Sequence, residues 1–219
     1  IAATRSTDTQ TNLYRQLGNH AAEHISDFGL AEDSYNQVLQ RRSGDVVALH
    51  ALARLVQHHG EPLRAVQLLE QAVESALTLS APVEAVAGGT PSTLGMLQPR
   101  YGLGSDSKAP VGAQAAALLA CELGALYEQL AGSGHADALT RAVACYEEAL
   151  RKDPRCRPAA RALVSLYRSQ QRTAELMSAM AKLLPLLRDD QQRLGLLLEM
   201  GELEQQRAQL HPEVAEHAT

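Results

Sequence analysis

A short polar motif near the N-terminus has the residue types of a zinc site. The sequence His20-Ala-Ala-Glu23-His24 places two histidines four residues apart. Histidines with this spacing share one face of a helix, and the glutamate is the general base in metalloproteases that have the H-x-x-E-H pattern. No clear third ligand follows, and Ala21 belongs to a regular apolar stripe. The motif therefore favours a packing helix, with a zinc-dependent hydrolase as the alternative that metal analysis would test.

The remaining candidate motifs lack the spacing or the context that chemistry needs. His58 and His59 precede a glycine, which indicates a solvated helix end, although they could bind a stray metal ion. The segment Gly102–Lys108 lacks the spacing of a phosphate-binding loop and does not follow a predicted strand. No pattern in the sequence brings a nucleophile and a base together. We therefore predict a non-enzymatic protein with no catalytic residue, metal or cofactor.

Composition limits the class of protein and its partners. The 219 residues are 45% hydrophobic but only 3% aromatic, a mixture that suits close helix packing better than sheets. A formal net charge of −5 argues against a globally basic nucleic-acid-binding protein. No apolar run reaches about 18 residues, the length that would indicate a membrane span. These features predict no nucleic-acid partner and no membrane insertion.

The cysteines and the chain ends bear on compartment and context. The three cysteines, Cys121, Cys145 and Cys156, are an odd number without a C-x-x-C pair. This argues against a disulfide framework or a zinc module, so we expect a reducing, intracellular and cytoplasmic setting. The first residue is Ile1 rather than Met, and Thr219 interrupts a pattern, so we expect the sequence to be part of a longer chain.

An internal repeat is the element that must position these side chains. Residues 46–79 have apolar residues at helical spacing on two consecutive helices, which Gly60-Glu61-Pro62 separates. Matched apolar positions recur 34 residues apart: Ala31 and Ala65, Tyr35 and Leu69, Val38 and Ala72, Ala142 and Leu176, Tyr146 and Met180, and Ala149 and Leu183. A constant offset at six positions indicates a repeat of two-helix units.

The repeat predicts that the whole chain, 1–219, forms one helical-repeat domain. We predict a frayed polar lead-in at 1–10, helix pairs at 11–45, 46–79, 114–154 and 155–190, an incomplete unit at 191–219, and an irregular insert at 80–113. The first helix is expected over 11–26, with Leu13 and Leu17 on its buried stripe. Pro185 is expected to kink or end a helix near Leu184.

Turn residues give finer expectations at the helix ends. Gly44 is expected to stop the second helix, and Asp45 to cap the third. Pro62 suits the first turn of the fourth helix, because its missing amide hydrogen has no partner there in any case. His211-Pro212 is expected to start the second helix of the incomplete unit.

The third unit matches a known repeat signature most fully, with Leu123, Gly124, Tyr127, Ala142, Tyr146, Ala149 and Pro154. The first unit repeats the pattern with Tyr14, Leu17, Gly18, Ala21, Ala31, Tyr35 and Val38. Together they resemble the tetratricopeptide repeat, whose signature is W-x₂-L-G-x₂-Y…A-x₃-F…P. The second unit departs from the signature at Ala53 and Val56, and the fourth at Val164. The resemblance implies an all-α, right-handed α-solenoid of about 4.5 helix pairs.

The insert at 80–113 interrupts the solenoid. Its prolines, glycines and serines exclude a long helix. Two interpretations stay open: a surface loop without fixed structure, and a segment that apolar side chains anchor on the solenoid. The candidate anchors are Leu94, Met96, Leu97, Tyr101 and Leu103.

In the tetratricopeptide family the first helix of each pair lines a concave groove. By this resemblance, the residues expected to form a partner-binding groove are Arg15, Asn19, His50, Arg54, Gln57, His58, Arg161, Ser165 and Arg168. Glu23, Cys121, Ala125 and Glu128 are expected to face the same groove. Four arginines against two glutamates, in a chain that is acidic overall, favour an acidic partner segment.

The resemblance implies binding of another protein or peptide rather than chemistry. The first hypothesis is a protein–protein interaction scaffold or adaptor that holds a partner segment in the groove. The second is an architectural subunit of a large multiprotein assembly, which contacts its partners through the convex face or the insert. Peptide binding that depends on the groove residues would separate the two.

Overall fold

The structure, a computed structural model, describes residues 2–25, 27–80, 111–135 and 137–210. These ranges consist of helices and turns, and no strand occurs in them. The elements are α1 (Ala2–His20), the π-helical turn η1 (Ala21–Ile25), α2 (Phe28–Arg41), α3 (Val46–His58), α4 (Pro62–Ser80), α5 (Val111–Gly132), α6 (Ala138–Lys152), α7 (Arg157–Ser169), α8 (Thr173–Leu183), the 3₁₀ turn η3 (Leu184–Leu186) and α9 (Asp190–Leu210). The predicted all-α fold class is confirmed.

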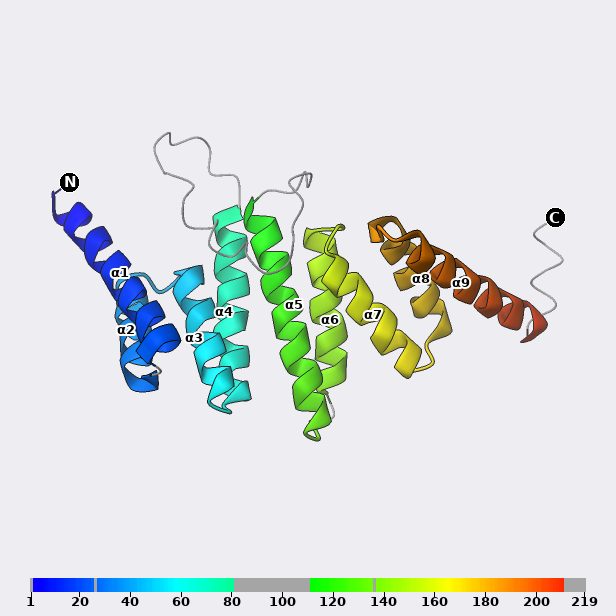
Figure 1. The fold of residues 1–219 in the computed structure, drawn as a ribbon, viewed down its shortest axis with the longest axis horizontal. Helices are drawn as coiled ribbons and strands as arrows, with labels where there is room; N and C mark the ends of the chain where they lie inside the picture. The colour runs from blue at the N-terminus through cyan, green and yellow to red at the C-terminus, as the bar shows by residue number, and fades with distance from the viewer. Residues whose placement is uncertain (1, 26, 81–110, 136, 211–219) are drawn as a thin grey trace. The chain divides into compact units, whose positions relative to one another are not determined.

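The chain forms two compact units, Ile1–Asp153 and Pro154–Thr219. The first unit contains α1 to α6, and each of these helices packs against the next one along the chain. Figure 1 shows α3, α4, α5 and α6 side by side in this order. Neighbouring helices in sequence are therefore neighbours in space, as a solenoid of stacked helix pairs requires.

The core of the first unit lies at the repeat positions. Ala31, Ala65, Ala72 and Ala142 are completely buried, so the helices meet through small side chains at these points. Larger apolar residues fill the layers between them: Leu49, Leu52, Val56, Leu69, Leu119, Leu123 and Tyr127. Burial of each large apolar side chain stabilises the fold by about 1.5–3 kcal/mol. The predicted stripes of the second and third helix pairs are confirmed.

Two glycines let a tyrosine of the second helix lie against the backbone of the first. A Cβ on Gly18 would lie 2.7 Å from Cε1 of Tyr35, and a Cβ on Gly124 would lie 2.8 Å from Cε1 of Tyr146. Such distances are shorter than any packed contact, so a side chain at either glycine would displace the ring. The glycine of the repeat signature therefore has a steric reason in this chain.

The helix ends agree with the turn predictions except at one glycine. Asp45 caps α3, because its Oδ1 accepts a hydrogen bond from the amide of Ala48 at 3.0 Å. Gly60 adopts φ +84° before α4 begins at Pro62. The role expected of Gly44 was wrong: its φ is not positive, and the residue that caps the end of α2 is Arg42, whose amide donates to the carbonyl oxygen of Val38.

The N-terminal prediction needs two corrections. Helix α1 begins at Ala2, so residues 2–10 are helical rather than a frayed lead-in, and the expected helix over 11–26 changes at His20 into the turn η1. An ion pair between Asp8 and Arg42 holds this N-terminal extension to the end of α2. The polar composition of residues 1–10 concealed this contact, because its partner lies 34 residues away.

The outer stripe of α1 also differs from the prediction. Leu13 is 58% exposed and Leu17 is 40% exposed, whereas Gly18 and Ala21 are buried as expected. In the described residues α1 packs mainly on α2, and the Arg15–Asp45 ion pair joins it to the start of α3. A helix that packs between two neighbours buries both of its sides, so a pattern written for such helices overestimated the burial at Leu13 and Leu17.

The edges of the insert were placed wrongly by a few residues. Ser80 is the last residue of α4 and Val111 is the first of α5, so the predicted range 80–113 overlaps both helices. The alanine-rich start of α5 explains this, since alanine propagates a helix readily. The candidate anchors from Leu94 to Leu103 lie outside the described residues.

The second unit contains α7, α8, η3 and α9. Leu163, Val164 and Tyr167 of α7 and Leu176, Met180 and Leu183 of α8 are buried, as the repeat predicted. Helix α8 ends at Leu183 before Pro185, which confirms the early end expected from a proline without an amide hydrogen. Helix α9 exposes Leu194, Leu197 and Leu198. The helix expected from His211 lies outside the described residues.

Candidate functional site

The first helices of the three pairs in the first unit, α1, α3 and α5, carry most of the predicted groove residues. We call the surface formed by these helices and η1 the first-helix face, defined by one alanine, Ala125, and by the polar residues Asn19, Glu23, His50, Arg54, Gln57, His58, Glu122, Glu128 and Gln129. Glu23, Arg54, Gln57, His58, Ala125 and Gln129 are exposed, and the others are partly buried. The face therefore presents polar groups to solvent from three successive repeats.

Two contacts join α3 to α5 on this face. His50 Nε2 lies 2.5 Å from Glu122 Oε2, and Gln57 Nε2 donates a hydrogen bond to Gln129 Oε1 at 3.3 Å. Both contacts join residues 72 positions apart, so they mark one register between the two helices. His50 and Gln57 lie two helical turns apart on α3, and a contact to α5 holds each of these side chains in position.

Arg54 lies between His50 and Gln57 in sequence but, unlike them, has no bonding partner on α5. It is exposed and makes no hydrogen bond or ion pair with any other residue in the described part of the chain. Between Glu122 and Glu128, α5 presents only Leu-Gly-Ala-Leu-Tyr, without a carboxylate. The guanidinium group of Arg54 consequently keeps its charge and its donors available.

Asn19 is held by the tyrosine of its own repeat. The Tyr35 hydroxyl donates a hydrogen bond to Asn19 Oδ1 at 2.8 Å. The pKa of Tyr35 is raised to about 12, chiefly by burial and also by the charge of Glu23, while the charge of Arg54 opposes the rise. These electrostatic effects place Glu23 of η1 and Arg54 of α3 near the same hydroxyl of Tyr35, which lies on α2.

The third repeat shows the same arrangement with a carboxylate. The Tyr146 hydroxyl donates to Glu128 Oε1 at 2.6 Å, and burial together with this bond raises the pKa of Tyr146. Glu128 is thus already engaged within the protein. Ala125 is exposed, whereas Cys121, which was predicted to face the groove, is buried.

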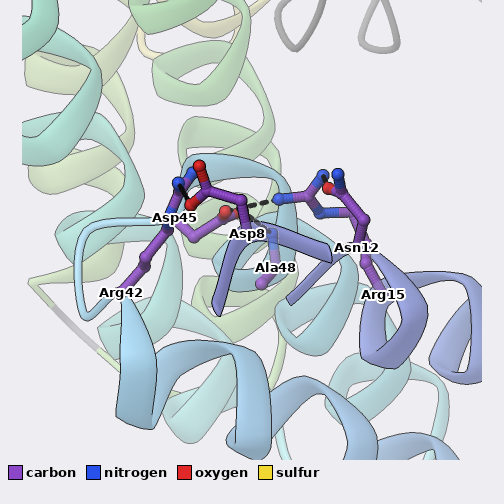
Figure 2. A network of polar contacts seen from close by, with 6 residues as sticks. All are labelled: Asp8, Asn12, Arg15, Arg42, Asp45 and Ala48. Atoms are coloured by element: carbon purple, nitrogen blue, oxygen red, sulfur yellow. Dashed lines mark hydrogen bonds and ion pairs between the residues drawn. The ribbon is translucent and has the colours of Figure 1, made fainter. Parts of the chain in front are cut away.

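Arg15 is buried rather than presented to solvent. Figure 2 shows its guanidinium group between Asn12 and Asp45, with Arg42 paired to Asp8 nearby. Arg15 Nη2 lies 2.6 Å from Asp45 Oδ2, and Nη1 donates to Asn12 Oδ1 at 3.1 Å. Asp45 is also the cap of α3, so this buried ion pair fixes α1 against the start of α3.

The second unit holds its predicted residues through α9. Arg168 makes two hydrogen bonds to the carboxylate of Glu199, at 2.8 and 2.7 Å, and this pairing offsets its charge. Arg161 donates to Gln192 Oε1 at 2.9 Å, but an amide leaves its positive charge in place. Ser165 is exposed between them.

The charge balance of the predicted residues changes once their partners are known. Arg15 is neutralised by Asp45 and Arg168 by Glu199. Arg54 and Arg161 keep their charges, one in each compact unit. The positive charge that the arginine count predicted is therefore reduced to Arg54 and Arg161 among the predicted residues, and the first-helix face also carries the carboxylates of Glu23, Glu122 and Glu128.

Similar solved structures agree with this arrangement of helices. The chain is similar to a crystal structure of MamA protein, with a TM-score of 0.53 and 15% identity over 96% of each chain. It is also similar to a MamA RS-1 ArsTM double mutant, with a TM-score of 0.51 and 12% identity over 90% of this chain and 96% of that one. Both neighbours are of the tetratricopeptide type.

The chain has the tetratricopeptide repeat fold. No protein-family model matches the sequence, and no curated protein sequence matches it either. At 12–15% identity the likeness to MamA concerns the fold alone.

The tetratricopeptide register explains which residues the sequence did not reveal. Glu122, Gln129, Gln192 and Glu199 all contact predicted residues but were not among the candidates. The signal that could have located them is the number of residues that separates contacting positions on successive first helices. This separation is 72 residues from α3 to α5 and 31 residues from α7 to α9. The insert lengthens the first of these offsets, so a constant period of 34 could not have located those partners.

The remaining candidate groups are the cysteines and the two histidines of the N-terminal motif. Cys121 and Cys156 are buried, and burial raises the pKa of the Cys145 thiol to about 11, so this thiol stays protonated near neutral pH. His20 and His24 are exposed with ring centroids 4.8 Å apart. In the described ranges, no three donor side chains lie close enough to hold a metal together, and no helix has the length and hydrophobicity of a membrane span.

Proposed function

We propose that this tetratricopeptide chain is an interaction scaffold that binds a segment of another protein along the first-helix face. The observation that supports this most is Arg54, an exposed and unpaired guanidinium group between two fixed contacts, His50–Glu122 and Gln57–Gln129. Neighbouring side chains that are already ordered lose little conformational entropy on binding. A face of this kind suits recognition of an extended or helical segment.

The partner segment that suits this face has an acidic residue opposite Arg54. A guanidinium group without a carboxylate in the facing turn of α5 offers two parallel donors to an aspartate or glutamate. Arg161 offers a second positive charge in the other compact unit, because its partner Gln192 is neutral. Exposed pairs of this kind contribute about 0.2–1 kcal/mol each and raise the association rate at low salt.

The test begins with peptides selected from a random displayed library on the unmodified protein. Selected sequences should be enriched in acidic residues, and their binding should weaken as salt rises from about 0.05 M to about 0.5 M, because screening shortens the Debye length. Arg54→Glu should lower affinity about 2- to 30-fold, since reversal removes one exposed ion pair and adds a repulsion. Arg161→Glu, measured separately, tests whether the second unit takes part.

Arg151→Glu is the matched control, since Arg151 is exposed on α6, a second helix outside the face. The same charge change there should leave peptide affinity within about twofold. Equal losses in the Arg54 and Arg151 variants would reduce the effect to net charge. Selected peptides without acidic enrichment, bound equally well by the Arg54→Glu variant, would contradict binding on this face.

A second function, an architectural subunit that binds through its second helices, has one observation in its favour. Leu30, Leu63 and Leu139 are exposed, and each lies in the first turns of the second helix of its pair. Exposed leucines near the starts of three successive second helices suit a contact with a large assembly. Loss of partner capture by Leu63→Lys, with capture retained by Arg54→Glu, would favour this function over the first.

A further inference from the structure

The two histidines of the N-terminal motif lie on one exposed turn. His20 is the last residue of α1, and His24 lies in the π-helical turn η1. Their ring centroids are 4.8 Å apart, and the ring planes are tilted by 50°. Both side chains are exposed, so neither ring is part of the packed core. π-helical turns within α-helices occur often at functional sites.

The spacing of the two rings matches the spacing that one shared metal ion would set. A zinc–nitrogen bond of about 2.0–2.1 Å and a ring radius of about 1.1 Å place each centroid about 3.2 Å from the metal. Two such rings have centroids about 4.5 Å apart at a right angle and about 5.2 Å apart at a tetrahedral angle. The observed 4.8 Å lies between these two values.

The surroundings limit the site to two protein ligands. Glu23 lies between the histidines in sequence and is exposed, but no group of three donor side chains able to hold a metal occurs in the described residues. Water would therefore fill the other coordination positions. Two neutral imidazoles suit copper, nickel and zinc, whereas magnesium and calcium prefer oxygen ligands.

We propose that His20 and His24 chelate one divalent late transition-metal ion, with Cu²⁺ bound more tightly than Ni²⁺ or Zn²⁺. The affinity order follows the general stability order of these ions with nitrogen ligands. The site needs no partner protein, so it does not depend on the proposed function. It also differs from a metalloprotease site, which requires a third protein ligand.

Bound metal would clamp the joint between the first two helices. The amide of Asp27 donates to the carbonyl oxygen of Ala21 at 3.1 Å, and Asp27 in turn caps α2 by accepting from the amide of Leu30 at 3.0 Å. A chelate from His20 to His24 bridges the start of this turn. Because the metal binds the folded turn, it stabilises this joint by mass action.

The test is calorimetric titration with Ni²⁺, and separately with Cu²⁺, on the full chain after removal of any affinity tag. One ion should bind per chain. His20→Ala and His24→Ala should each weaken binding by at least about tenfold, because loss of even an outer-shell partner weakens metal sites by about 10- to 100-fold. Both side chains are exposed, so circular dichroism without metal should show unchanged folding for each variant.

The double variant His58→Ala with His59→Ala is the matched control. These two histidines are adjacent, so they do not face one another on a helix, and the His59 ring contacts the Phe28 ring with centroids 3.7 Å apart and planes tilted by 42°. Metal affinity should stay unchanged in this variant. Binding that survives the loss of both His20 and His24, or that falls equally in the control, would overturn the proposal.

Spectroscopy gives a second and independent measurement. The electron paramagnetic resonance spectrum of bound Cu²⁺ should show two imidazole nitrogens in the unmodified protein and one at most in either single variant. Hydrogen exchange of the amides from Ala21 to Asp27 should slow when metal is added, and this slowing should be absent in His24→Ala. A spectrum without nitrogen ligands, or exchange that metal does not change, would also overturn the chelate.

Discussion

At the scale of single residues, the contact between a glycine and a tyrosine ring controls how closely the two helices of a repeat pack. The ring of Tyr146 occupies the space above Gly124, and its hydroxyl reaches Glu128 on the same helix. Tyr35 repeats the arrangement with Gly18 and Asn19. One side chain thus fills the interface and orders a polar group of the first-helix face.

Gly124→Ala should destabilise the fold, because the added methyl group would lie within 2.8 Å of the Tyr146 ring. Overpacking of this kind lowers the free energy of unfolding by about 1–3 kcal/mol, which denaturant melts can measure. Gly195→Ala is the control, since a Cβ there meets nothing within 4 Å and alanine favours the interior of α9. A stable Gly124→Ala variant would mean that Tyr146 leaves this position easily.

Alkaline pH should destabilise the protein through the same tyrosines. The pKa of Tyr35 is raised from 10.0 to about 12 in the folded state, while the unfolded chain keeps the ordinary value. The neutral phenol therefore contributes stability that is complete below pH 10 and is lost as pH rises towards 12.

Denaturant melts at increasing pH measure this loss. Tyr35→Phe should show a shallower decline above pH 10 than the unmodified protein, although the raised pKa values of Tyr127 and Tyr146 contribute in the same direction. Ultraviolet titration of tyrosinate in the folded state provides the direct check. A folded protein whose tyrosines all ionise near pH 10 would contradict the prediction.

At the scale of the helices, burial along one face decides which leucine matters. Leu69 and Leu63 both lie on α4, but Leu69 is 2% exposed and Leu63 is 57% exposed. Leu69→Ala should lower the free energy of unfolding by about 2–5 kcal/mol, because it removes core contacts and leaves a cavity. Leu63→Ala should change it by about 0.5 kcal/mol or less. Equal effects in denaturant melts would show that the repeat phase is wrong.

The sequence predicted the helix pairs well where the apolar period was regular, as along α3, α4 and α6. It failed where a contact joined residues far apart in sequence, and where one side of a helix had no packing partner in the described residues. The start of α1 is held by the pairing of Asp8 with Arg42, and the side of α1 that carries Leu13 is exposed. Neither condition appears in a local pattern.

The candidate site was less predictable than the fold for a related reason. Repeat geometry indicated which side of each first helix carries polar groups, but not which of them would bond to one another. Arg15 meets Asp45 across a helix pair, and His50 meets Glu122 across the insert. Such pairs depend on the register between helices, which side-chain packing sets and composition does not.

At the scale of the whole molecule, each compact unit has a core of its own, and the likeness to MamA covers 96% of the chain. Stability in such folds is close to a sum over repeats and the interfaces between neighbours. The unpaired charges of Arg54 and Arg161 belong to different units, which is why the binding test treats them as separate variants.

The packing of α4 against α5 has a consequence for the order of folding. These helices are neighbours in the stack, yet residues 81–110 separate them in sequence, whereas only residues 42–45 separate α2 from α3. In the unfolded chain, closing the longer connection costs about 2 kcal/mol more in loop entropy. Contacts between sequence neighbours form sooner than contacts across long connections. The nucleus of the first unit should therefore form within α1 to α4 or within α5 and α6, and the joining of α4 to α5 should be the slower step.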